Sequence, residues 1–113
     1  MKAHVFHSKK MNYRDIHDGM LITKPEFEHM YELVAIIPMS DDDVAEGINH
    51  MLEVAFEATN SIGEHWCKYD FFKFDFRVER ARSTSVGDIV VLESEKGREN
   101  FVVAPVGWYD FRM

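Results

Sequence analysis

The sequence predicts a single α+β domain over residues 1–113, with a four- or five-stranded antiparallel or mixed sheet and one main amphipathic helix at about residues 40–60 packed on one face. Three observations lead to this fold. Several short segments have the apolar pattern of strands, one longer segment has helical periodicity, and 113 residues with 46% hydrophobic content suffice for one core but hardly for two.

Five segments have strand patterns: Lys2–Ser8, Tyr31–Ile37, Phe71–Glu79, Ile89–Leu92 and Phe101–Val106. Tyr31–Ile37 is nearly all apolar and rich in β-branched residues, so we expect a strand covered on both faces, central in the sheet and ended by Pro38. In Phe71–Glu79, aromatic and aliphatic residues alternate with charged ones, which predicts one buried and one wet face.

Residues 40–60 carry the clearest helix pattern. Ser40 can cap the N-terminus and Asp43 has the spacing of a capping box, while Asp41–Asp43 place negative charge where the helix dipole favours it. The expected apolar stripe is Val44, Ile48, Met51, Leu52, Ala55, Phe56 and Thr59. The expected polar side is Glu46, Asn49, His50, Glu53 and Glu57. We therefore expect one continuous helix in which Gly47 costs about 1 kcal/mol relative to alanine.

The remaining segments read as connections. Residues 11–28 predict a loop, with a short helical turn after Pro25. The polar segment 93–100 predicts a hairpin loop longer than two residues between the last two strands. Gly107 allows a bend. The tryptophans Trp66 and Trp108 are expected to close the end of the core, and a pocket lined by Trp108, Tyr109 and Trp66 is the alternative.

Composition narrows the class of protein. A net charge of -7 repels nucleic-acid phosphates and anionic lipids alike, so direct nucleic-acid binding is disfavoured. Uninterrupted apolar runs are only a few residues long and the N-terminus lacks a signal-peptide pattern, which predicts no membrane contact and a cytoplasmic location. With Cys67 as the only cysteine, no disulfide can form within the chain.

Motifs for catalysis and metal binding are missing from the sequence. The pairs His65 with Cys67 and His4 with His7 do not have the spacing of structural zinc sites. There is no Gly-x-Ser-x-Gly turn and no phosphate-cradling glycine loop. We expect a protein that is not an enzyme and has neither a metal nor a cofactor.

The segment 82–88, Arg-Ser-Thr-Ser-Val-Gly-Asp, concentrates a cation, hydroxyls and a carboxylate just before a strand. Arg82 could bind a phosphate or carboxylate through two hydrogen bonds while Ser83 and Ser85 donate further ones. Trp108, from the end of the hairpin, could complete such a site. These four residues are the candidate ligand-binding set.

A tight turn explains the same segment without a ligand. Gly87 can adopt positive φ, and the Asp88 carboxylate can accept hydrogen bonds from nearby backbone amides. The turn is the simpler interpretation, and the binding site stays open as the alternative.

Residues 82–90 and 102–108 together resemble small proteins of bacteriophages and plasmids that share an Arg-Ser-x-Ser-Val-x-Asp block before a terminal hairpin, with the YodL-like family as the nearest name. Residues 56–61 and Trp66 are also similar to the phage versions, so the likeness covers about the C-terminal two-thirds. The resemblance implies a phage or mobile-element origin and a small accessory role. It brings no reaction, cofactor or catalytic residue.

We therefore expect a small non-enzymatic accessory protein of a phage or plasmid that acts by protein–protein interaction, with a host protein or a second copy of itself as the partner. The acidic side of the 40–60 helix and the outer side of the 71–79 strand are the candidate surfaces. The alternative is a small-ligand protein that binds a nucleotide or other anion at the 82–88 turn.

Overall fold

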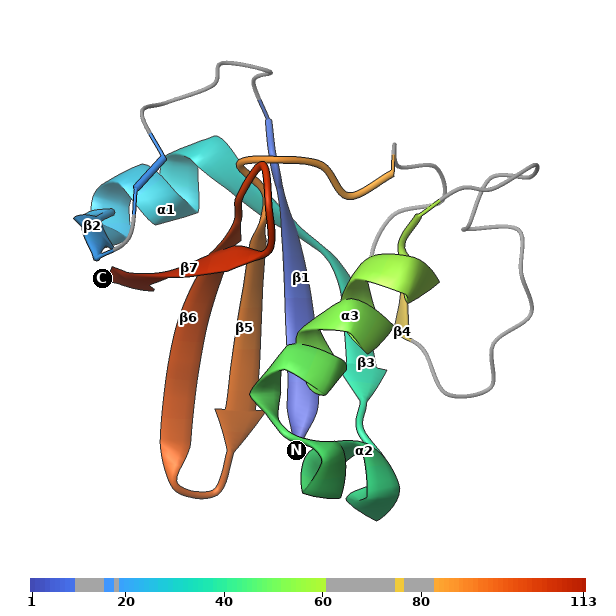
Figure 1. The fold of residues 1–113 in the computed structure, drawn as a ribbon. Helices are drawn as coiled ribbons and strands as arrows, with labels where there is room; N and C mark the ends of the chain where they lie inside the picture. Colours follow the sequence, from blue (N-terminus) through green and yellow to red (C-terminus); the bar gives the residue numbers. More distant parts are fainter. Residues whose placement is uncertain (10–15, 18, 61–74, 77–82) are drawn as a thin grey trace.

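A computed structural model describes residues 1–9, 16–17, 19–60, 75–76 and 83–113. In chain order, the elements are β1 (Lys2–Ser8), β2 (Met20–Leu21), α1 (Lys24–Met30), β3 (Tyr31–Pro38), α2 (Asp41–Glu46), α3 (Ile48–Ala58), β4 (Asp75–Phe76), β5 (Ile89–Ser94), β6 (Gly97–Val103) and β7 (Trp108–Arg112) (Figure 1). The expected strand 71–79 lies outside the described residues except for β4, and so do His65, Trp66, Cys67 and Arg82.

The α+β class is confirmed, and the sheet is mixed. Within the described residues it has seven strands in the order β2-β7-β6-β5-β1-β3-β4, with β2 and β7 parallel and the other pairs antiparallel. Seven exceeds the expected four or five because β2 and β7 were not predicted. The central position expected for Tyr31–Ile37 is wrong: β1 lies between β3 and β5, which leaves β3 next to the edge strand β4.

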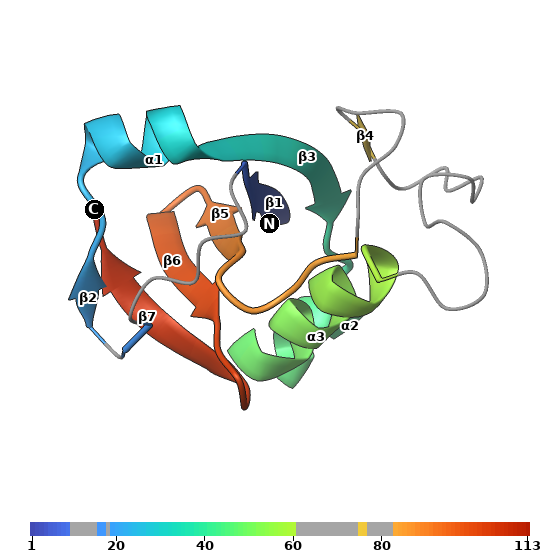
Figure 2. The ribbon, with the colours of Figure 1, turned by 90° about the horizontal axis from the view of Figure 1, so that it is seen from above.

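Two hydrophobic clusters lie on opposite faces of the sheet. The first joins Met51, Leu52 and Ala55 of α3 to alternate residues of β1 and β5, including Val5 and Val90. The second contains residues of the opposite pleat of β5, together with Ile22, Tyr31 and Phe111, and Phe27 of α1 packs against it. Seen from above, α1 and α3 accordingly lie on opposite sides of β1 and β5 (Figure 2).

The predicted single helix is two helices. Ser40 forms the predicted capping box with Asp43 at the start of α2, but α2 ends at Glu46 and α3 begins at Ile48. Gly47 between them has φ 104° and ψ 179°, a conformation open essentially to glycine alone. Its amide donates to Val44 O and its carbonyl accepts from Met51 N, so it ends one helix and starts the other.

The C-terminal hairpin is tighter than expected, because β5 and β6 continue through the polar residues to a two-residue turn, Glu95-Lys96. Glu93 and Arg98 face each other across the strands, with 3.1 Å between Arg98 Nε and Glu93 Oε2. β6, which was predicted as the last strand, ends at Val103 and not at Val106. The Ala104 amide donates to Gly107 O, and the chain turns back to form β7.

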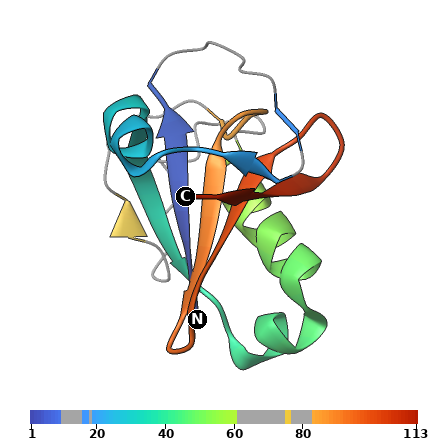
Figure 3. The same ribbon diagram turned by 90° about the vertical axis from the view of Figure 1, so that its left-hand side faces the viewer.

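The segment expected to be a loop up to residue 28 contains β2 and most of α1. Thr23 caps α1 by accepting from the Glu26 amide, and Pro25 lies in its first turn, so the predicted helical turn is a seven-residue helix. β2 runs beside the C-terminal end of β7 (Figure 3). No helix in the described part of the chain has both the length and the apolar character required to cross a membrane.

Candidate functional site

The described part of the 82–88 segment forms a turn held by its own groups. Gly87 has φ 94°, and the Asp88 carboxylate accepts from the Ser85 amide at 2.8 Å, as the turn interpretation predicted. The Ser85 hydroxyl donates to Ser83 O at 3.1 Å. Tyr31 Oη donates to Gly87 O at 3.1 Å, which attaches the turn to the start of β3.

Asp88 also holds the turn against β1, because its second carboxylate oxygen accepts from the Ser8 amide at 2.9 Å. Asp88 belongs to a group of four buried polar side chains that the sequence analysis did not predict. We call His7, Thr59, Thr84 and Asp88 the polar latch; their exposed fractions are 3%, 0%, 3% and 0%. It joins β1, the end of α3 and the turn before β5.

The hydrogen-bond pattern of the latch fixes a proton on His7. Thr59 donates its single hydroxyl proton to Ala55 O at 2.8 Å, so Thr84 is the donor in the 2.6 Å contact between the two hydroxyls. Thr84 therefore accepts from His7 Nε2–H at 2.8 Å. The same nitrogen lies 3.9 Å from Asp88 Oδ2. The latch thus links β1, the end of α3 and the turn before β5 through buried and partly buried hydrogen bonds.

Trp108 lies in a pocket that neither Ser83 nor Ser85 lines. It is half-buried against the α3 side of the core, and its pocket of about 180 Å³ is formed with Phe56, Val103, Ala104, Pro105 and Gly107. Within the described residues, the indole Nε1 is buried and has no hydrogen-bond partner. Arg82 lies outside the described residues, so the four-residue set stays a prediction.

The surface of α2 and α3 combines exposed aliphatic side chains with acidic ones. Val44 and Ile48, which the sequence placed on the buried stripe, are 38% and 41% exposed. The break at Gly47 turns α2 away from the line of α3, so Val44 does not continue the buried stripe, and Ile48 lies exposed in the first turn of α3. Met51, Leu52 and Ala55 of the stripe are buried as predicted.

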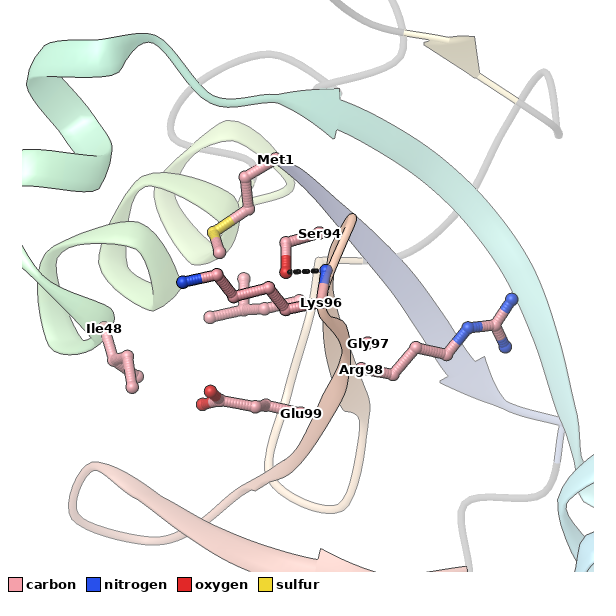
Figure 4. Close-up of a pocket in the computed structure, with 8 residues that line it drawn as sticks. Met1, Ile48, Ser94, Lys96, Gly97, Arg98 and Glu99 are labelled. Carbon is pink, nitrogen blue, oxygen red and sulfur yellow. Dashed lines mark hydrogen bonds between the residues drawn. The ribbon is translucent and has the colours of Figure 1, made fainter.

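A pocket of about 160 Å³ opens beside this surface, between Met1, the start of α3 and the tip of the β5–β6 hairpin. Its apolar wall is Met1, Ile48 and Leu92, and the hairpin contributes Lys96 and Glu99. Figure 4 shows the ends of these two charged side chains directed toward the space beside Ile48, whereas Arg98 points away. We call Met1, α2, Ile48 and the hairpin residues 94–99 the docking end.

A hydrogen bond between two side chains braces the junction of the two helices at the docking end. His50 Nε2 lies 3.0 Å from Asp43 Oδ1, across the break at Gly47. The hydrogen bond with His50, followed by those with Ser40, lowers the pKa of the Asp43 carboxyl below its ordinary value. The sequence had placed His50 on the solvent side of the helix without a partner.

Comparisons with known proteins yield no relative: no family model, curated protein or solved structure matches the chain. The resemblance to YodL-like proteins therefore stays a prediction. Within the part of the chain that the structure describes, no group of three His, Cys, Asp or Glu side chains is placed to hold a metal ion.

Proposed function

We propose that the protein is a small non-enzymatic accessory protein of a phage or plasmid that binds a host protein through the docking end. The phage or plasmid origin rests on the resemblance of the C-terminal segment. The interaction rests on one structural observation: Val44 and Ile48 have helical spacing suited to the core but lie exposed beside a pocket.

Exposed aliphatic side chains gather at this end. Six large hydrophobic side chains of the described residues are more than a third exposed, and three of them, Met1, Val44 and Ile48, belong to the docking end. Exposed apolar side chains that gather in one region of a surface are typical of interaction sites. In Figure 1, the N-terminus, α2 and the hairpin tip lie at the same end of the molecule.

Charge indicates the kind of partner. The docking end carries six acidic side chains against the two cations Lys96 and Arg98; the acids are Asp41, Asp42, Asp43, Glu46, Glu95 and Glu99. Such a surface attracts a basic partner and speeds its association at low ionic strength. It also disfavours pairing with a second copy of the same surface. We therefore assign the docking end to a basic host protein that inserts an aliphatic or aromatic side chain beside Ile48.

The pocket volumes favour a protein partner over a nucleotide. Sites for drug-sized ligands occupy roughly 300–1,000 Å³, and the docking-end pocket has about 160 Å³. A cavity of about 150 Å³ accommodates benzene, so this pocket has room for one side chain. At the 82–88 turn, moreover, the Asp88 carboxylate would repel an anion.

A comparative pull-down from bacterial lysate tests the proposal. Ile48→Thr removes apolar surface from the docking end, and Glu46→Lys reverses one charge on α2. Val106→Thr and Glu32→Lys are the matched controls, because Val106 is 89% exposed elsewhere and Glu32 is an exposed acid on β3. We expect one specific partner that both docking-end variants lose and both controls retain.

The partner should also be released by added salt, since exposed ion pairs are screened over about 8 Å at physiological ionic strength. Failure of the folded wild-type protein to recover a specific partner would contradict the interaction itself. Equal loss in variants and controls would place the surface elsewhere.

A further inference from the structure

A third pocket lies on the face of the sheet opposite to that of the docking-end pocket. Four separate parts of the chain form it: Phe6 of β1, Lys24 and Phe27 of α1, the adjacent strands β5 and β6, and the C-terminal residue Met113. Its volume is about 220 Å³, the largest of the three pockets described here. No motif in the sequence accounts for it, and the residue that it shares with the docking end is Arg98.

The floor of this pocket is apolar and aromatic. Val91 of β5 is 4% exposed and belongs to the second hydrophobic cluster. Phe6 and Phe27 meet edge to face, with their ring centroids 4.7 Å apart, and Phe27 stacks on Tyr31 at 5.6 Å. A third ring placed over Val91 would continue this arrangement, because aromatic rings favour such edge and offset contacts.

The rim carries two cations and one acid. Lys24 and Arg98 are the cations, and Glu28 is the acid. Glu93 orients Arg98 through the 3.1 Å contact at Nε. Among the described residues, no carboxylate makes an ion pair with Lys24. Asn100 adds an amide at the same rim, which can donate a hydrogen bond to an oxygen.

We propose that this pocket binds a small monocyclic aromatic carboxylate. The ring would lie over Val91 and beside the contacting rings of Phe6 and Phe27, and the carboxylate would reach Lys24 and Arg98. Volume sets the size: benzene occupies a cavity of about 150 Å³, so about 220 Å³ admits one ring with a carboxylate and excludes a nucleotide.

Methyl NMR titrations of the full chain at constant ionic strength test the proposal, with benzoate as the probe and benzyl alcohol and hexanoate as comparisons. Benzoate should shift the Val91 methyl signals with a dissociation constant of about 1 mM or tighter. Lys24→Gln and Arg98→Gln should each weaken binding about threefold, the effect of losing one exposed ion pair. The matched control is Lys96→Gln, an equally exposed cation of the same hairpin that lines the other pocket and should bind benzoate like wild type.

Several results would overturn the proposal. If benzoate leaves the Val91 signals unchanged, the pocket does not bind the ligand. If benzyl alcohol binds as tightly as benzoate, the rim cations do not recognise the carboxylate. If hexanoate binds as tightly as benzoate, the aromatic floor does not select a ring. A loss in Lys96→Gln equal to that in Lys24→Gln would mean a general effect of protein charge.

Discussion

Replacing Asp88 with alanine removes the acceptor of two backbone amides at once. Ser8 N and Ser85 N donate to the two carboxylate oxygens at 2.9 and 2.8 Å, from β1 and from the turn before β5. Both contacts are partly buried. An amide left without a partner costs about 1–3 kcal/mol when fully buried, so we take the lower half of that range for each.

The expected loss is therefore about 2–4 kcal/mol of unfolding free energy for Asp88→Ala. Asp88→Asn keeps one carbonyl oxygen and turns an NH₂ group toward the other amide, so it should lose about half as much. Either change is large beside the roughly 5–15 kcal/mol by which a domain of this size is stable.

Urea denaturation followed by circular dichroism measures this loss as a lower midpoint at an unchanged slope. Asp110→Ala is the control, since Asp110 is an exposed carboxylate on β7 and its removal should change stability by less than about 0.5 kcal/mol. Equal midpoints for Asp88→Ala and Asp110→Ala would refute the assigned role of Asp88 in the latch.

Three further changes test other parts of the fold. Thr84→Val keeps the side-chain shape but removes the acceptor of His7 Nε2–H, so thermal or urea unfolding should show a loss of about 1–2 kcal/mol. Gly47→Ala meets no atom within 4 Å, so its cost of about 1–3 kcal/mol should come from the backbone conformation alone; an unchanged midpoint would contradict the break between α2 and α3. The folded-state pKa of Asp43 is lowered, so its stabilising contribution is present above the ordinary value of 3.8 and lost as pH falls through the folded pKa. His50→Gln should therefore flatten the acid side of the stability–pH curve, and an identical curve would exclude the pair.

Sequence patterns predicted a structural element correctly where residues close together in the chain determine it. The bounds of β1 agree with the structure because its side chains alternate between the two faces. The capping box of Ser40 and Asp43 formed because both partners lie within one helical turn. The positive φ of Gly87 followed from the same kind of local chemistry.

Local sequence patterns could not predict the contacts between segments that are distant in the chain. Ser8 and Asp88 are 80 residues apart, and they meet because β1 lies between β3 and β5, an order that neither strand specifies. The helix stripe also assumed an unbroken period through Gly47. Glycine weakens a helix by only about 1 kcal/mol, so its presence in the sequence did not decide between a tolerated residue and a break.

The polar latch, which we assign to stability, and the docking end, which we assign to partner binding, lie at opposite ends of β1 and α3. β1 runs from Lys2, beside the docking end, to His7 and Ser8 at the polar latch, and α3 likewise runs from Ile48 toward Thr59. The 11 residues of α3 span about 16 Å at 1.5 Å per residue. Side chains that far apart without shared partners act nearly independently.

Latch and docking-end variants should therefore have different effects. Thr84→Val should lower the unfolding midpoint and leave partner capture intact at temperatures where the variant is folded. Ile48→Thr should abolish partner capture and leave the unfolding midpoint nearly unchanged. Replacing a side chain that is 41% exposed changes stability little. If Ile48→Thr were to lower the midpoint as much as Thr84→Val, then Ile48 would contribute to the core, and its exposure would no longer support a docking surface.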